Sequence, residues 1–177
     1  MKYALVFTLL AALMLPGLAG CTPPNMTPEQ IALASYGTSY TATYVGSRLF
    51  LDNEKVTSEE LLKIDKVISE TVLPYLTQLE DSNDLYVVFY PLIEAKILEE
   101  VEEGRIRTIA LALISQGLRI GENYLDSHPE INDQKDQWLP VVTSVFRGIA
   151  EGCRDAANPT SEVAQLRWRL YTEEGRT

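Results

Sequence analysis

Two groups of residues in this chain have types and spacings that could do chemistry, and the first is a single cysteine. Cys21 carries a nucleophilic thiol and follows the small residues Ala19 and Gly20. It closes a segment in which Lys2 precedes an uncharged apolar stretch from Tyr3 to Leu15. Because that stretch falls short of the ~20 residues that a membrane-spanning helix requires, the layout predicts a secretory signal rather than a span.

The run Leu18-Ala19-Gly20-Cys21 resembles the lipobox of bacterial lipoproteins. The resemblance implies that the Cys21 thiol takes a diacylglyceryl group, that cleavage occurs before Cys21, and that its new amine is acylated. Acyl chains of this kind would anchor the protein stably to a membrane. Thr22 follows in place of Asp, which resembles the pattern sent to the outer membrane in a host with two membranes. The alternative is an ordinary secreted protein with a chance cysteine after its cleavage site.

These features divide the chain into three parts. Residues 1–20 form the expected signal peptide, residues 21–26 the lipidated cysteine with a proline-rich tether, and residues 27–177 one helical domain. The prolines of the tether favour an extended geometry of ~3.1 Å per residue, so the tether would reach only ~15 Å. We therefore expect a bacterial membrane location, with the domain facing the periplasm or the exterior.

The charge balance of the chain restricts its partners. It has 25 acidic residues against 15 Lys and Arg, which gives a net charge of −10 at pH 7. Such a chain lacks the attraction to phosphates that supplies most nucleic-acid binding, so no nucleic-acid partner is expected. Anionic lipid headgroups would repel the domain as well, so the membrane contact is assigned to the lipid at Cys21.

The second group is a row of tyrosines that ends in an arginine. Tyr36, Tyr40, Tyr44 and Arg48 follow one another at a spacing of four residues. On a helix this spacing places all four side chains on one face. Tyrosine is enriched at interfaces, and the guanidinium could stack on a ring or take an anionic group. The row is therefore a candidate interaction surface. The alternative is a half-buried helix whose hydroxyls reach the rim of the core.

Hydrophobic periodicity and capping signals predict an all-α fold, a single-domain bundle of five or six helices. Thr27-Pro28 and the run from Thr57 to Glu60 are typical of helix starts. Short loops favour antiparallel neighbours. Two segments, 38–45 and 85–90, are compatible with either helix or strand. The second helix carries an apolar stripe of Leu61, Ile64, Ile68, Val72, Tyr75 and Leu79. In the first helix, one face holds Ile31, Ala34, Thr38, Val45 and Leu49.

Two pairs of glycines predict close helix packing. Gly117 and Gly121 lie one turn apart on one expected helix, and Gly148 and Gly152 do so on the next. Missing side chains let two backbones approach each other, as in membrane dimers, but charged neighbours argue against a membrane role here. We expect the two glycine pairs to pack the fourth helix against the fifth inside the core, with an oligomer contact as the alternative.

Signals for catalysis or metal binding are weak. The only histidine, His128, precedes Pro129 in an expected turn, and the acidic run from Glu99 to Glu103 would fan its carboxylates around one helix. We therefore expect no catalytic residue, no metal site and no cofactor besides the covalent lipid. Cys153 shares the helical spacing of Phe146 and Ile149, which favours a buried thiol over a reactive one.

Together these patterns favour a lipid-anchored, non-catalytic interaction or assembly component of the bacterial envelope, with a protein partner. Two alternatives stay open. One is a helical module that binds a small or apolar ligand between the tyrosine-bearing helix and its neighbours. The other is an envelope glycan hydrolase that uses paired carboxylates, which leave no short motif. The sequence does not set the oligomeric state.

Overall fold

The first helix begins where its capping residues predict. In the computed structural model, which describes residues 26–82, 85–101, 104–131 and 134–172, α2 (Pro28–Asp52) follows Thr27 directly. The Thr27 side chain accepts from the backbone N–H of Gln30, and the Gln30 side chain accepts a 2.9 Å bond from the Thr27 N–H. The same reciprocal pair at Thr57 and Glu60 opens α3 (Ser58–Val67). Residues 1–25, with Cys21, lie outside the described part.

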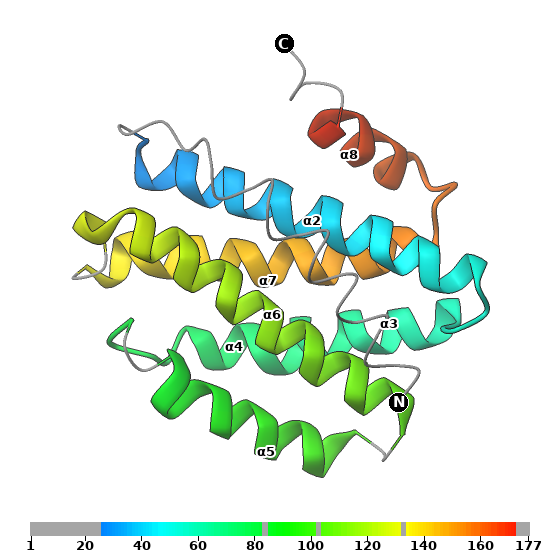
Figure 1. Cartoon of the computed structure of the whole chain (residues 1–177), viewed down its shortest axis with the longest axis horizontal. Helices are drawn as coiled ribbons and strands as arrows, with labels where there is room; N and C mark the ends of the chain where they lie inside the picture. The colour runs from blue at the N-terminus through cyan, green and yellow to red at the C-terminus, as the bar shows by residue number, and fades with distance from the viewer. Residues whose placement is uncertain (1–25, 83–84, 102–103, 132–133, 173–177) are drawn as a thin grey trace.

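The described part of the chain holds six helices and no strand, when the unbroken run from Ser58 to Leu76 is counted as one helix, so the all-α prediction is confirmed. Successive helices alternate in direction (Figure 1). Segment 38–45 lies inside α2, and segment 85–90 covers a π-helical turn and the start of α5, so both are helical. After α3 the elements are η1 (Ile68–Val72), α4 (Leu73–Leu76), η2 (Leu85–Phe89), α5 (Tyr90–Glu100), α6 (Arg105–Ser127), η3 (Pro129–Ile131), α7 (Lys135–Ala157) and α8 (Glu162–Thr172).

Both π-helical turns, η1 and η2, end two residues before a proline. Pro74 follows η1 and Pro91 follows η2. A proline inside a helix has no N–H to donate, and its ring clashes with the carbonyl four residues earlier. The wider winding of a π turn gives that carbonyl room, and in η1 the N–H of Leu73 bonds the carbonyl of Ile68, five residues back.

The π turn also rotates the residues that follow it. A winding of 3.6 residues per turn predicts that Tyr75 continues the buried stripe after Val72. Instead Leu76 is fully buried and Tyr75 is half-buried. The spacing of four from Ile68 through Val72 to Leu76 matches the wider winding of the π turn.

The buried face of α2 consists mainly of small side chains, and it shares only Ile31 with the face of Ile31, Ala34, Thr38, Val45 and Leu49 that the sequence suggested. Val45 and Leu49 are 41% and 52% exposed. The hydroxyl of Ser39 donates to the Ser35 carbonyl at 2.8 Å, so a serine can be buried without losing a hydrogen bond. The buried residues of α2 are Ile31, Ala32, Ser35, Ser39, Tyr40, Thr43, Gly46 and Ser47.

Helix α7 lies on this small-residue face, and α2 and α7 run parallel (Figure 1). A Cβ added at Gly148 would lie 2.6 Å from the Tyr36 carbonyl oxygen, and one at Gly152 would lie 2.9 Å from the Cβ of Thr43. Neither space can hold a methyl group without moving α2. Gly148 and Gly152 therefore pack against α2, and the expectation that they face the helix of Gly117 is wrong.

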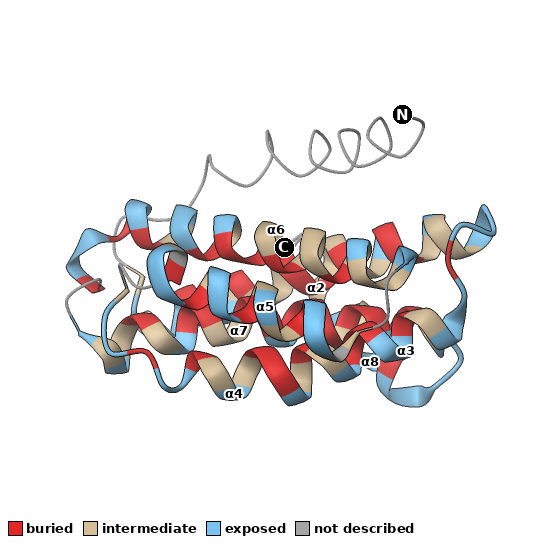
Figure 2. Ribbon diagram, turned by 90° about the horizontal axis from the view of Figure 1, so that it is seen from below, coloured by how far each residue is buried: buried red, intermediate tan, exposed pale blue. Residues whose placement is uncertain are grey.

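The glycines of α6 do face α7. A Cβ at Gly117 would lie 2.8 Å from the ring of Phe146, whereas one at Gly121 would make an ordinary 3.4 Å contact with Val142. Most of the inner side of α7 is buried (Figure 2), because α2, α3 and α6 all pack against it. In the described residues, no helix combines the length and the apolar character needed to cross a membrane.

Candidate interaction surfaces

The tyrosine row of α2 lies beneath α8. Tyr40 is fully buried, and its ring stacks on that of Tyr36 with centroids 6.0 Å apart and planes 7° apart. From α8, the ring of Tyr171 lies 5.0 Å from Tyr36 and 5.7 Å from Tyr40, and Trp168 lies 4.8 Å from Tyr44. A Cβ at Gly37, between the tyrosines, would lie 2.9 Å from the Tyr171 ring. The tyrosine row is thus the surface on which α8 packs.

Two carboxylates of α7 meet the hydroxyls of this row. The hydroxyl of Tyr36 donates to Glu151, and that of Tyr40 donates to Oδ2 of Asp155 at 3.0 Å. Arg167 of α8 lies between the two acids, with Nε 3.0 Å from Glu151 and Nη1 3.0 Å from Asp155. The Asp155 side chain is only 4% exposed, so its charge is balanced by these partners and little by water.

The protonation of these tyrosines excludes one role for them. Burial raises the pKa of Tyr36 and Tyr40 far above the ordinary value, and the adjacent carboxylates raise the pKa of both further. Both phenols therefore stay protonated at neutral pH and act as hydrogen-bond donors. A catalytic base would need a pKa near the working pH, so the arrangement supports cohesion of three helices and not acid–base chemistry.

Arg48, the last member of the row, has a different environment. It is half-buried, donates to the Ala156 carbonyl at 3.4 Å and pairs with Asp52 of its own helix at 3.3 Å. A cation at the carboxyl end of α7 complements the helix dipole. Arg48 thus binds the end of α7 and does not join the carboxylates that face the tyrosines.

Sequence reasoning missed the partners of the row. Glu151 and Asp155 stand four residues apart on α7, and Arg167 and Tyr171 stand four apart on α8. Each pair therefore shares one helix face. The face of α7 is acidic and that of α8 carries an arginine, and these opposite charges could have predicted that the two faces meet. A second ion pair, in which Arg154 binds Asp65 through two 2.8 Å contacts, ties α7 to α3 and carried no such signal.

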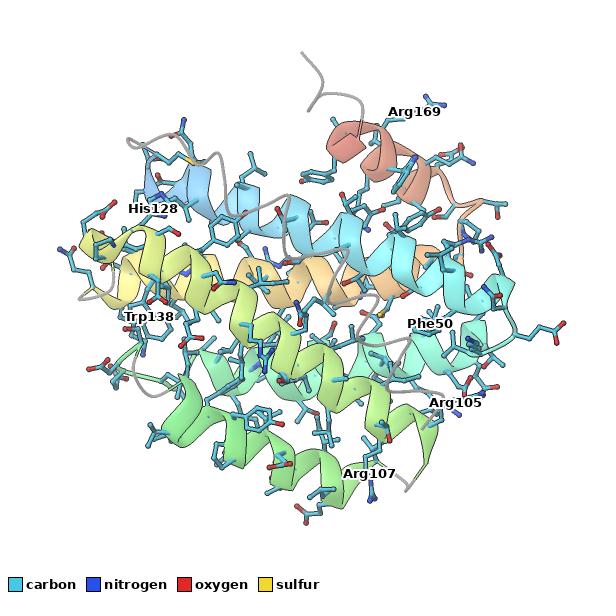
Figure 3. The ribbon with its side chains drawn as sticks, in the orientation of Figure 1. Phe50, Arg105, Arg107, His128, Trp138 and Arg169 are labelled. Carbon is cyan, nitrogen blue, oxygen red and sulfur yellow. The ribbon has the colours of Figure 1, made fainter. Side chains whose placement is uncertain are left out.

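The single cysteine and histidine of the described residues lie inside the fold. Cys153 is fully buried, and burial raises the pKa of its thiol to about 12. His128 is buried at the carboxyl end of α6 (Figure 3), with Nδ1 3.0 Å from the Tyr124 carbonyl oxygen. In the parts of the chain that the structure describes, no three His, Cys, Asp or Glu residues are placed to hold a metal ion.

A shallow hollow of about 510 Å³ lies beside α3, away from the tyrosine row. Its polar side chains include Lys63 and Lys66, and the Lys66 ammonium lies 3.8 Å from Glu70 of the same wall. No residue of α2 lines it, so it is not the ligand site that the sequence suggested between the tyrosine-bearing helix and its neighbours. Its lining residues are Lys63, Lys66, Val67, Glu70, Thr71, Val101 and Ile106.

Large apolar side chains are exposed on α2 (Leu33, Val45 and Leu49) and α3 (Leu62), and also on α5 and α8, two helices at opposite edges of the molecule (Figure 1). On α5 and the turn before it these are Val87, Val88, Leu92 and Leu98. On α8 they are Val163, Leu166 and Leu170. Exposed apolar side chains that share one helix face are typical of interaction sites.

Similarity to other proteins adds nothing to these observations. Comparison with protein-family models, with curated proteins and with solved structures gives no match. The function is therefore inferred from the residues and their geometry.

Proposed function

We propose that the protein is a lipid-anchored, non-catalytic interaction or assembly component of the bacterial envelope. The lipid at Cys21 would hold it on the membrane, on the outer membrane where the host has two. The outer face of α5 would bind a partner protein. The lipobox-like run Leu18-Ala19-Gly20-Cys21 supports the anchor, and the exposed apolar face of α5 supports the partner.

Helix α5 is apolar on both of its sides, and this observation carries the proposal. Its inner side packs Ile93 and Ile97 into the core, 0% and 1% exposed. Its outer side leaves Leu92 and Leu98 41% and 48% exposed, and Val88 of the preceding turn η2 is 48% exposed. A helix that only covers a core keeps polar residues on its outer face, so a second apolar face indicates a second contact.

The charges beside this face indicate what the partner looks like. Glu94 and Glu99 lie on the same helix, and Glu99 pairs with Lys96 at 3.0 Å. The chain as a whole carries a net charge of −10. A complementary partner therefore has an apolar groove with basic side chains at its rim, because matched charges steer association and exclude other proteins.

A photo-crosslinking amino acid at Leu92, in the full-length protein and in intact cells, tests this proposal. We expect one discrete crosslinked species of higher mass, whose partner mass spectrometry identifies. Glu122 is an exposed position on α6 and serves as the matched control. Equal crosslinking at the two positions, or no discrete species from Leu92, would refute a binding face on α5.

A further inference from the structure

Only part of the apolar surface of helix α8 packs against α2. Ala164 is buried, and Trp168 and Tyr171 lie against the tyrosine row. The adjoining side leaves Val163, Leu166 and Leu170 exposed at 55%, 60% and 42%. These three recur at spacings of three and four, which is the spacing of a seam between two packed helices.

Two opposite charges flank this seam. Glu162 precedes Val163 and Arg169 precedes Leu170, so the two charges stand seven residues apart beside the same edge. Both side chains are exposed, and within the described residues neither makes an ion pair or hydrogen bond. Arg169 lies at the outer edge of the molecule, away from the bundle (Figure 3).

We propose that α8 pairs with α8 of a second copy in an antiparallel arrangement. Val163 of one copy then lies opposite Leu170 of the other, and the two Leu166 side chains meet near the twofold axis. The flanking Glu162 of each copy faces Arg169 of its partner, which forms two equivalent ion pairs. In a parallel pair the like charges would lie level with each other and both ion pairs would be lost.

The contact needs no change in the fold. Arg167 stays bound to Glu151 and Asp155 beneath α8 while the outer side pairs. Three apolar side chains per copy are a small surface beside the ~800 Å² per partner of a standard protein complex. The pairing is therefore weak in dilute solution and is favoured when copies are concentrated on a membrane. It uses α8 and a second copy, so it goes beyond the partner proposed for α5.

Cysteine crosslinking of the full-length protein in membranes tests the arrangement. Differently tagged Val163→Cys and Leu170→Cys chains, expressed together and oxidised, should give a mixed disulfide dimer. Either variant alone should give much less, because antiparallel helices hold identical positions apart. Gln165→Cys, on the polar side of α8, is the matched control. A dimer from Val163→Cys alone would indicate a parallel pair, and equal yields from Gln165→Cys would indicate chance collision. Either result overturns the proposal.

A charge exchange, made in the same pair of cysteine chains, supplies the second test. Glu162→Arg alone or Arg169→Glu alone places like charges across the contact and should lower the yield of mixed dimer about fivefold. The double variant restores both ion pairs and should restore the yield. Unchanged yields in the single variants, or no recovery in the double variant, would refute the antiparallel pairing. Thermal melting confirms that these exposed substitutions leave the fold intact.

Discussion

The hydroxyl of Tyr40 donates a 3.0 Å hydrogen bond to Oδ2 of Asp155, and both residues are buried. Arg167 binds both oxygens of the same carboxylate at 3.2 and 3.0 Å. One acidic side chain of α7 therefore joins α2 and α8. Since a buried charge without partners is strongly unfavourable, the three helices depend on one another at this point.

Tyr40→Phe removes one donor from that carboxylate and leaves the ring. Because hydrogen bonds to charged groups contribute ~1.5–3 kcal/mol, we expect the free energy of unfolding to fall by about 2 kcal/mol. Urea denaturation measures the change. Tyr44→Phe is the control, because the Tyr44 ring stacks on Trp168 and its hydroxyl makes no hydrogen bond with another described residue. Equal losses in the two variants would show that the Tyr40–Asp155 bond contributes little.

Arg167→Met leaves Glu151 and Asp155 close together without their cation. Removing one partner of a buried ion pair costs about 3–5 kcal/mol. The ring contacts of Trp168 and Tyr171 then remain to hold α8, and we expect them to be too weak to keep it packed on α2. Amide hydrogen exchange should accelerate in α8 while the core of α7 stays protected. The exposed Arg169→Met should leave the exchange of α8 unchanged. Normal protection of α8 in Arg167→Met would contradict the assigned role of Arg167.

Gly148→Ala places a methyl group 2.6 Å from the backbone oxygen of Tyr36. A backbone atom cannot yield as a flexible side chain does, so we expect a loss of about 3 kcal/mol in unfolding free energy. Gly121→Ala is the matched control, since its methyl group would meet Val142 at 3.4 Å. That variant should gain up to about 1 kcal/mol, because alanine favours helix over glycine. A mild effect at Gly148 would mean that the two helices can separate at little cost.

Stability should fall in alkaline solution. Burial raises the pKa of the Cys153 thiol from 9.0 to about 12, so the folded protein keeps a proton that the unfolded chain loses above pH 9. That difference removes about 1.4 kcal/mol of stability by pH 10 and more up to pH 12. The raised pKa values of Tyr36 and Tyr40 add a further loss above pH 10. Urea unfolding of Cys153→Ala should show a shallower decline between pH 9 and 10, and an identical decline would contradict this explanation.

Lipidation at Cys21 is testable by mass spectrometry of the N-terminus of the membrane-bound protein. We expect the chain to begin at Cys21 and to carry a diacylglyceryl group and an amide-linked acyl chain. Cys21→Ser removes the nucleophile and should release the protein from the membrane. A Cys21→Ser protein that stays on the membrane, or an unmodified Cys21 in the normal protein, would argue against the anchor.

The helices were predictable because their signals are local. The capping pairs at Thr27 and Thr57 each satisfy backbone donors within four residues, so the starts of α2 and α3 follow from short runs of sequence. The burial of Cys153 follows from helical spacing in the same way. The alternation of direction follows from loops too short for any other connection.

The pairing of helices was not predictable in the same way. Gly148 and Gly152 fit against α2 because Ser39 and Thr43 opposite them are small, and those residues lie more than 100 positions away in the chain. A serine-rich segment is typical of an exposed surface. This segment of α2 becomes part of the core only because α7 packs on it. The tyrosine row was correctly placed on one helix face. The packing of α8 over the tyrosine row depends on ion pairs between Arg167 of α8 and two acids of α7, Glu151 and Asp155. These contacts join separate helices, so no local pattern predicts them.

The parallel course of α2 and α7 has a mechanical consequence. The start of α2, where the chain emerges from the segment next to Cys21, and the end of α7, which leads into α8, lie at opposite ends of the helix pair. A force applied between these two points therefore acts along the helix axes and shears the contact instead of peeling it open. The contacts of Gly148 and Gly152 with α2 both bear that force, because neither glycine can slide past the backbone of α2 without a clash. A chain held at its N-terminal segment and pulled through α8 would therefore load the whole length of the contact between α2 and α7 at once.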